Sequence, residues 1–145
     1  MNAHRSEIQA WECLTLVRHQ QIGRLCIIDH GVPLTFPVNF KLTGNDQESQ
    51  VVVRTAPHTL IGQYEGPASF EVDQIDAVER RAWSVILRGK LRRIAGAHEL
   101  PDPEPWLADN RHQWIVLDVV AVSGRRFVGV PAAVGFTVEW QFGTD

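Results

Sequence analysis

The stretch LTFPVNFKL, residues 34–42, alternates apolar with polar or proline residues over its whole length. This period of two is typical of a strand that buries one face and exposes the other. Pro37 lies on the otherwise polar face, two residues before Asn39. Because proline removes a donor from the sheet ladder, it is usually confined to edge strands and bulges. The stretch therefore predicts a half-buried strand with an unusual polar face.

The flanking patterns predict a mainly β, antiparallel protein. A strand at 22–28 precedes this stretch and a valine-rich strand at 50–55 follows it, each across a short turn. Connections this short cannot carry a parallel crossover, so the three strands predict an antiparallel meander. Further strands are expected at 68–73, 83–95 and 112–122, with a short continuation at 126–130.

Helices are expected at two places, and charged or turn-rich segments between the strands. Ser6-Glu7-Ile8-Gln9 fits a capping box and predicts a helix from Ser6 to about His19. Pro57 predicts the start of a second helix over 58–65. The stretch QIDAVERR, residues 74–81, is expected to be a charged link, and Arg125 and Arg126 a solvated turn. Six or seven strands with these helices indicate a small barrel or sandwich.

Composition bounds the class of protein. The 145 residues are 44% hydrophobic and 21% charged, which predicts a single globular domain over 1–145. A net charge of −3 argues against nucleic acid as the main partner. Two cysteines without CxxC spacing, and no signal peptide or membrane-length apolar run, favour the cytoplasm. Residues 112–122 are apolar on both faces, and a small barrel covers one of them, so we expect a homodimer.

Five short motifs then resemble one known family. They are VRHQQIGRLCI, GVPLTFPVNF, VVVRTAPHTL, ASFEVDQID and WSVILRGKL, in this order, with VSGRRF near the end. The same order recurs in the pyridoxamine 5'-phosphate oxidase-like, FMN-binding split-barrel proteins, and most closely in their small bacterial branch. The resemblance implies a six-stranded antiparallel split β-barrel with an N-terminal helix and short connecting helices. It also implies an obligate dimer with one FMN in each of two grooves at the subunit interface.

The resemblance assigns candidate cofactor residues on three strands. It places the Pro-Val-Asn strand alongside the flavin ring, and the Arg-Thr strand end with the following helix start at the FMN phosphate. The Trp-Ser-Val strand would lie near the ring or serve the partner's cofactor. The resulting candidates are Pro37, Val38, Asn39, Arg54, Thr55, His58, Thr59, Trp83 and Ser84.

The residue types themselves suit these roles, although each has an ordinary alternative. A proline offers a rigid surface, and Asn39 on the same face offers a donor and an acceptor to the ring edge. Arg54 presents a planar fork that fits a phosphate. Alternatively, Pro37 marks an exposed edge and Arg54 is a solvated strand residue. Trp83 shares its face with Val85, so core packing explains it equally well, whereas Ser84 lies on the polar face.

The chain departs from the resemblance at the phosphate. Many relatives read roughly Thr-x-x-Gly-Thr-Lys-Leu, whereas residues 55–60 read TAPHTL and lack the lysine. His58 is the candidate to face the phosphate in its place. The departure leaves a deazaflavin, haem or no cofactor open as alternatives to FMN.

The sequence thus predicts an FMN-binding protein, and a flavin-dependent oxidoreductase acting on a small molecule. The alternative is a non-catalytic storage or sensor module for a flavin, a deazaflavin or haem. The six histidines are dispersed without metal-ligand spacing, and neither cysteine has a histidine nearby in sequence. No metal site is therefore expected, and no side chain stands out as a catalytic acid or base.

Overall fold

The computed structural model describes residues 2–96, 99–107 and 111–130 of the chain. It contains two helices and eight strands. In chain order these are β1 (His4–Glu7), α1 (Ala10–Arg18), β2 (Ile22–Asp29), β3 (Val32–Asn39), β4 (Lys41–Gly44), β5 (Ser49–Thr55), α2 (Leu60–Gln63), β6 (Gly66–Asp76), β7 (Arg81–Ile94) and β8 (Gln113–Val128).

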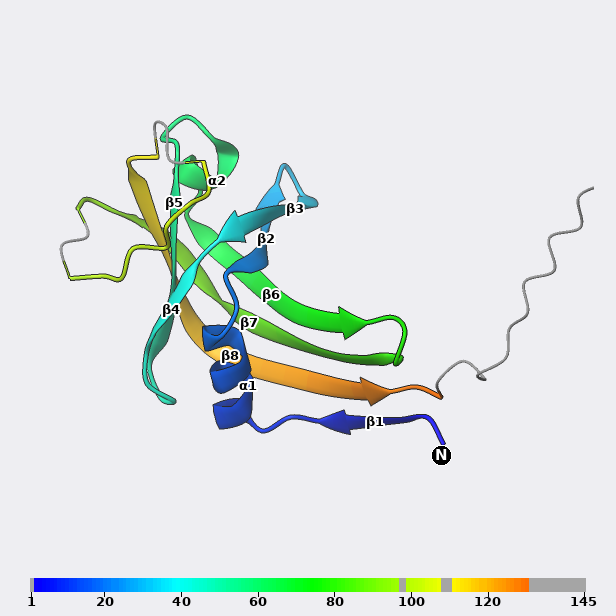
Figure 1. The fold of residues 1–145 in the computed structure, drawn as a ribbon. Helices are drawn as coiled ribbons and strands as arrows, with labels where there is room; N and C mark the ends of the chain where they lie inside the picture. The colour runs from blue at the N-terminus through cyan, green and yellow to red at the C-terminus, as the bar shows by residue number, and fades with distance from the viewer. Residues whose placement is uncertain (1, 97–98, 108–110, 131–145) are drawn as a thin grey trace, which may run out of the picture.

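All eight strands form one antiparallel sheet, which coils on itself (Figure 1). The strand order is β3-β2-β6-β7-β8-β5-β4, and β1 pairs with the far part of β8. β3 and β4 stand at opposite ends of this order, yet a single residue separates them in the chain. The chain therefore joins the two edges of the sheet, as a split barrel requires. The predicted mainly β, antiparallel fold is confirmed, with eight strands instead of six.

The stretch 34–42 is not one strand, and this corrects the sequence interpretation. β3 pairs with β2, β4 pairs with β5, and Phe40 lies between them. Phe40 is 1% exposed, and its ring packs edge-on against Phe70 with 4.8 Å between centroids. The predicted meander over 22–55 is therefore wrong: it is two hairpins joined at a corner. Burial of one aromatic side chain turns the backbone from one sheet edge to the other.

The alternation itself is as expected on both sides of that corner. Val38 packs against the core, whereas Pro37 on the opposite face is exposed. Pro37 lies across from Arg24 of β2, and Ile22 lies across from Asn39. β3 ends the strand order, so Pro37 stands in an edge strand, where the donor it lacks is not needed by a second neighbour.

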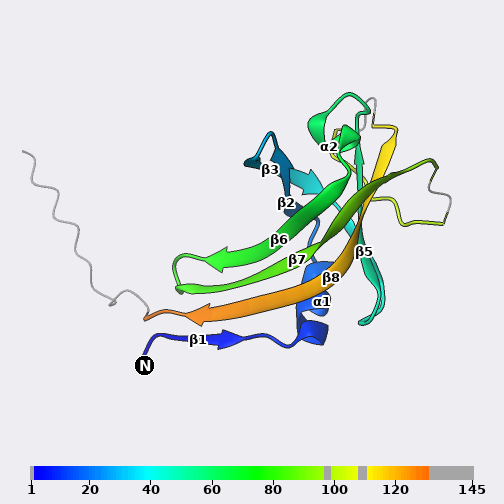
Figure 2. The same ribbon diagram turned by 180° about the vertical axis from the view of Figure 1, so that it is seen from behind.

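The long strands β6, β7 and β8 run side by side and project beyond the barrel (Figure 2). Residues 74–76 and Arg81 belong to β6 and β7, so the predicted charged link shrinks to a four-residue turn. Arg125 and Arg126 lie within β8, not in a turn, and β8 is one strand where two were predicted. The ladder with β7 holds these residues in extended form.

A bulge between Arg88 and Gly89 shifts the register of β7 against β8. A Cβ atom on Gly89 would lie 1.8 Å from the carbonyl oxygen of Asp118. Only glycine permits this approach of two backbones, and the bulge lets the two long strands bend around the barrel.

Both helices differ from their predicted bounds. Ser6 belongs to β1, where it pairs with Arg126, and α1 begins at Ala10 with Gln9 as its N-cap. The capping-box prediction is wrong because the ladder with β8 takes the backbone that a cap would need. α2 has only four residues, since Thr59 caps it and Tyr64 is already extended, so Pro57 falls in the preceding turn.

The core fills the coil of the sheet and is closed by α1. Cys13, Leu14 and Val17 of α1 are fully buried against it. In β8, Ile115, Val116 and Leu117 are all buried within the single chain, so both faces are covered there. Val120, four residues beyond Val116, is 80% exposed. Neither helix of the described ranges has the length and apolarity that a membrane crossing needs.

Candidate functional site

A pocket of about 300 Å³ opens between β3, β5 and the segment after β7. Four of the nine candidate residues line it: Pro37, Val38 and Asn39 from β3, and Arg54 from β5. The corner at Phe40 is what brings these two strands together. The remaining lining residues are Ile22, Ile61, Pro105, Trp106, Leu107 and Arg111.

Arg54 is the most constrained polar residue of this pocket. Its Nη1 donates to both carboxylate oxygens of Asp102, each at 2.9 Å, and its Nε donates to the carbonyl of Arg111 at 3.2 Å. The guanidinium also lies over the ring of Trp114, 5.2 Å from its centroid. Backbone donation from Glu104, together with Arg54, holds the pKa of Asp102 below its usual range. Arg54 thus already holds an anionic group.

The neighbouring candidates bond mainly to each other. Thr55 is buried, and its hydroxyl lies 2.9 Å from that of Thr59. The Thr59 hydroxyl also bonds the carbonyl of Ala56 and accepts from the amide of Gly62. His58 is exposed in the turn before α2 and is not among the residues that line the pocket. With a single helical turn at α2, the structure brings Arg54 to the pocket but not His58.

Trp83 and Ser84 of β7 lie on opposite faces, as the sequence parity indicates. Trp83 is 9% exposed and belongs to the core cluster, and its indole nitrogen donates to Gln74 at 3.3 Å. Ser84 lies across from Asp73 and Arg125 on the outer face. Neither residue lines the pocket between β3 and β5.

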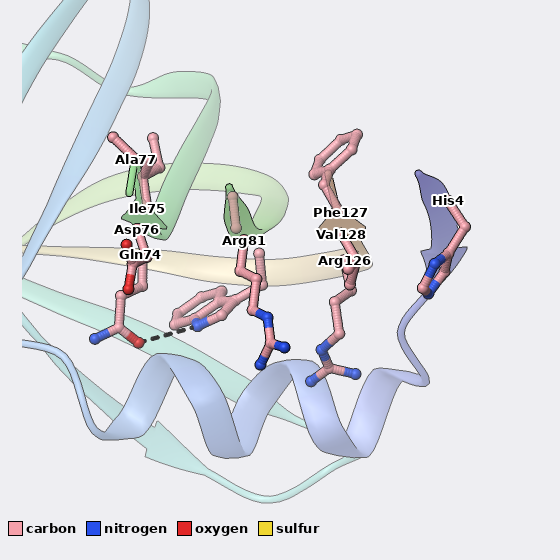
Figure 3. A pocket seen from close by; sticks show the side chains of 11 residues that line it. His4, Gln74, Ile75, Asp76, Ala77, Arg81, Arg126, Phe127 and Val128 are labelled. Atoms are coloured by element: carbon pink, nitrogen blue, oxygen red, sulfur yellow. Dashed lines mark hydrogen bonds between the residues drawn. The ribbon is translucent and has the colours of Figure 1, made fainter. Parts of the chain in front are cut away.

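Trp83 instead lines a larger hollow of about 900 Å³ under the projecting strands. Figure 3 shows the side chains of Gln74, Arg81 and Arg126 on the side of the sheet that faces α1, with Phe127 on the other side. Arg126 donates to Glu12 of α1 at 2.8 Å, which fixes its position. This hollow contains one candidate residue, so the gathering of four makes the smaller pocket the better site.

Sequence reasoning missed the segment that closes the pocket. Trp106 donates its backbone amide to Oδ1 of Asn39 at 3.0 Å, across 67 residues of sequence. Arg111 adds a second guanidinium to the lining. No local sequence pattern identifies Arg111. The pairing of Thr55 with Gln113 brings the residues just before β8 next to Arg54, and this register cannot be predicted from the sequence alone.

A charged cluster lies on the same outer face, one strand inward from Pro37. Arg24 pairs with Asp73 at 3.2 Å and with Glu71 at 3.8 Å. Oε1 of Glu71 is buried without a hydrogen-bond partner. Burial, and then the hydrogen bond and charge of Asp73, raise the pKa of Glu71 to about 7 against the opposing effect of Arg24. The Glu71 carboxyl therefore changes its protonation state near neutral pH.

Replacing Glu71 by glutamine is expected to stabilise the protein at neutral and alkaline pH, and little at acid pH. Because the folded-state pKa lies above the ordinary 4.5, stability from this site is full below pH 4.5 and is lost as pH rises through 7. Such a shift corresponds to about 3 kcal/mol, and solvent screening reduces it to about 1–2 kcal/mol. Urea denaturation at about pH 5 and about pH 8 measures the effect.

The matched control for this change is Glu79→Gln, in the exposed turn between β6 and β7. It removes the same charge and should leave the pH dependence of the free energy of unfolding as in the parent. An equal gain for both variants would show that net charge, not the Glu71–Asp73 pair, sets the pH dependence.

Residues 9–126 match the pyridoxamine 5'-phosphate oxidase family. The chain belongs to this family. The match spans both strands of the pocket and ends within β8, so the family assignment rests on most of the described fold. No curated protein matches the chain.

Solved structures are similar to this chain over most of its length. A FAD-binding protein from Mycobacterium smegmatis is 25% identical, with a TM-score of 0.67 over 86% of this chain and 99% of that one. A conserved protein of unknown function from Corynebacterium diphtheriae is 28% identical, with a TM-score of 0.72 over 86% and 98%. A FAD- and haem-binding protein from Mycobacterium smegmatis, 16% identical, shares the fold with a TM-score of 0.61 over 88% and 75%.

Proposed function

We propose that this protein binds FMN in the pocket between β3 and β5 and acts as a flavin-dependent oxidoreductase on a small molecule. The observation that carries the proposal is the convergence of Pro37, Val38, Asn39 and Arg54 on one pocket. Membership of the pyridoxamine 5'-phosphate oxidase family and the likeness to a FAD-binding protein support it. The bound flavin would supply the redox chemistry, and the chain would bind and orient it.

The residues present fit a flavin. Pro37 gives a rigid apolar surface for a planar ring, and Val38, Ile22 and Ile61 belong to the same lining. The amide of Asn39 has both a donor and an acceptor for the polar ring edge. Arg54 and Arg111 supply two guanidinium groups, which suit the phosphate of FMN.

The same lining fits haem less well. Haem iron takes an axial ligand from histidine, cysteine, methionine or tyrosine. The described lining residues include none of these four types. This donor set favours a flavin or a deazaflavin over haem in this pocket.

A second copy of the chain would complete the site. About 300 Å³ is at the lower end for a ligand pocket, so one protomer would leave much of a flavin uncovered. An apolar hollow of about 510 Å³ on the outer face, lined by Cys26, Ile28, Val120 and Ala121 among others, offers a surface for a homodimer. Ile28 is 49% and Val120 80% exposed there, which favours burial against another molecule.

Replacing Val120 by aspartate is expected to dissociate this homodimer. A carboxylate buried in an apolar interface has no partner, and its desolvation outweighs the contacts of one valine. Light scattering at micromolar concentration should report twice 16.3 kDa for the parent and 16.3 kDa for the variant. Val78→Asp, at an equally exposed valine in the β6–β7 turn, is the matched control and should remain dimeric. A monomeric parent would contradict the proposed assembly.

The test of function is spectroscopic. The purified protein, after incubation with FMN and removal of free flavin, should show the flavin absorption bands. Anaerobic bleaching of those bands by NADPH supports an oxidoreductase. Retained flavin that no nicotinamide reduces supports the storage or sensor alternative instead. A deazaflavin and haem can be tested in the same way, because their absorption spectra differ from that of FMN. If the protein retains either of them in preference to FMN, that cofactor takes the place of FMN in the proposal.

A further inference from the structure

One segment engages both polar ends of the candidate flavin pocket. Residues 99–107, here termed the strap, follow β7 and contribute Pro105, Trp106 and Leu107 to the pocket lining. Asp102 of the strap holds Arg54, and Trp106 of the strap holds Asn39. The two side chains best suited to a phosphate and to a ring edge are therefore both bound to the same internal segment.

Asp102 occupies the position that an anionic ligand group would need. Its two oxygens lie 2.9 Å from Nη1 of Arg54, within the range of charge-assisted hydrogen bonds. Oδ1 also accepts from the amide of Glu104 at 2.9 Å, which fixes the carboxylate in place. The Arg54 side chain is 20% exposed and that of Asp102 is 52% exposed, so water and ligands reach the pair from the Asp102 side.

The strap is held by these polar contacts together with the partial burial of Leu100 and its prolines. Trp106 is 70% exposed and Leu107 is 66% exposed, so these two apolar side chains add little to its anchoring, whereas Leu100 is half-buried. Pro103 is buried, but Glu104 has a φ of 51°, a left-handed conformation that is unfavourable for a residue with a side chain. When a ligand takes the place of Asp102 on Arg54, the strained backbone around Glu104 is therefore free to change its conformation.

We propose that Asp102 is a specificity-determining residue, an internal anion that the ligand's phosphate must displace from Arg54. This inference rests on the proposed flavin site. A phosphate monoester carries close to two negative charges and three acceptor oxygens, against one charge on a carboxylate. It can compete with Asp102, whereas a ligand without an anionic group cannot. Arg54 would then bind the phosphate of a ligand only after Asp102 has separated from its guanidinium.

The test compares two isosteric substitutions on the strap, Asp102→Asn and Glu104→Gln. Each removes one negative charge, but only Asp102 contacts Arg54. FMN should bind Asp102→Asn about fivefold more tightly than the parent, the factor expected for loss of one exposed ion pair. Glu104→Gln should stay within about twofold, and riboflavin should bind all three proteins alike. Fluorescence titration with FMN and riboflavin provides the affinities.

Hydrogen exchange supplies a readout independent of affinity. In the parent, FMN should speed exchange at the amides of Glu104 and Trp106, which donate hydrogen bonds to Asp102 and Asn39. Slower exchange there on FMN binding would overturn the proposal, because the strap would then close over the ligand. Equal FMN affinities for parent and Asp102→Asn would overturn it as well. If neither FMN nor riboflavin binds any variant, the proposed flavin function fails and this inference fails with it.

Discussion

Arg54→Ala weakens FMN binding by about 1.5–3 kcal/mol, or roughly tenfold or more, as the expected result of removing a charge-assisted hydrogen-bond donor. Arg54 is the guanidinium that β5 carries into the pocket, beside Pro37 and Asn39 of β3. Riboflavin, which lacks the phosphate, should bind the variant nearly as well as the parent. Flavin fluorescence titrations with both ligands measure the two affinities.

A matched control for Arg54→Ala lies on β7, which is separated from β5 by β8. Arg92 of β7 also pairs with an aspartate, Asp118, at 2.7 Å, and it is not among the residues of the pocket. Arg92→Ala removes a cation of the same kind and should leave FMN affinity unchanged. Equal losses of FMN and riboflavin affinity in Arg54→Ala would mean that Arg54 supports the fold or the ring, not the phosphate.

Phe40→Ala should lower the free energy of unfolding by about 3–5 kcal/mol, the usual cost of deleting a fully buried aromatic ring. Phe40 is 1% exposed and packs on Phe70, which is fully buried. The ring anchors the corner at which the chain passes from one sheet edge to the other, so its loss should also loosen β3. Urea denaturation followed by tryptophan fluorescence measures the change.

Phe127→Ala serves as the comparison, since Phe127 is 37% exposed on the projecting end of β8. Its loss should cost less than about 1.5 kcal/mol, because a half-exposed ring loses less contact and leaves no closed cavity. Similar costs for the two variants would contradict the role assigned to the corner at Phe40.

Local pattern was sufficient for most of the strands and for the faces of their side chains. Successive side chains of a strand point to opposite faces, so the alternation in 34–42 fixes Val38 toward the core and Pro37 and Asn39 away from it. The same rule separates buried Trp83 from Ser84. These statements survive the error over the single strand, because the backbone geometry holds on each side of Phe40.

Local pattern failed wherever two structures competed for the same backbone. Ser6 has the sequence of a helix cap, but its backbone pairs with β8 instead. Arg125 and Arg126 have the composition of a turn, but the ladder with β7 keeps them extended. In each case the partner strand is more than 35 residues away in the sequence, so the local sequence does not predict the pairing.

The candidate site likewise combines features that the sequence predicts with features that only the tertiary structure sets. The sequence determined which residue types could meet a flavin and which face of β3 carries them, since both follow from side-chain chemistry and a period of two. Tertiary structure alone decided that Arg54 meets Asp102 across 48 residues, that Trp106 meets Asn39 across 67, and that Arg111 joins the pocket. Sheet closure at Phe40 and the β5–β8 register create these contacts, and both depend on packing between distant segments.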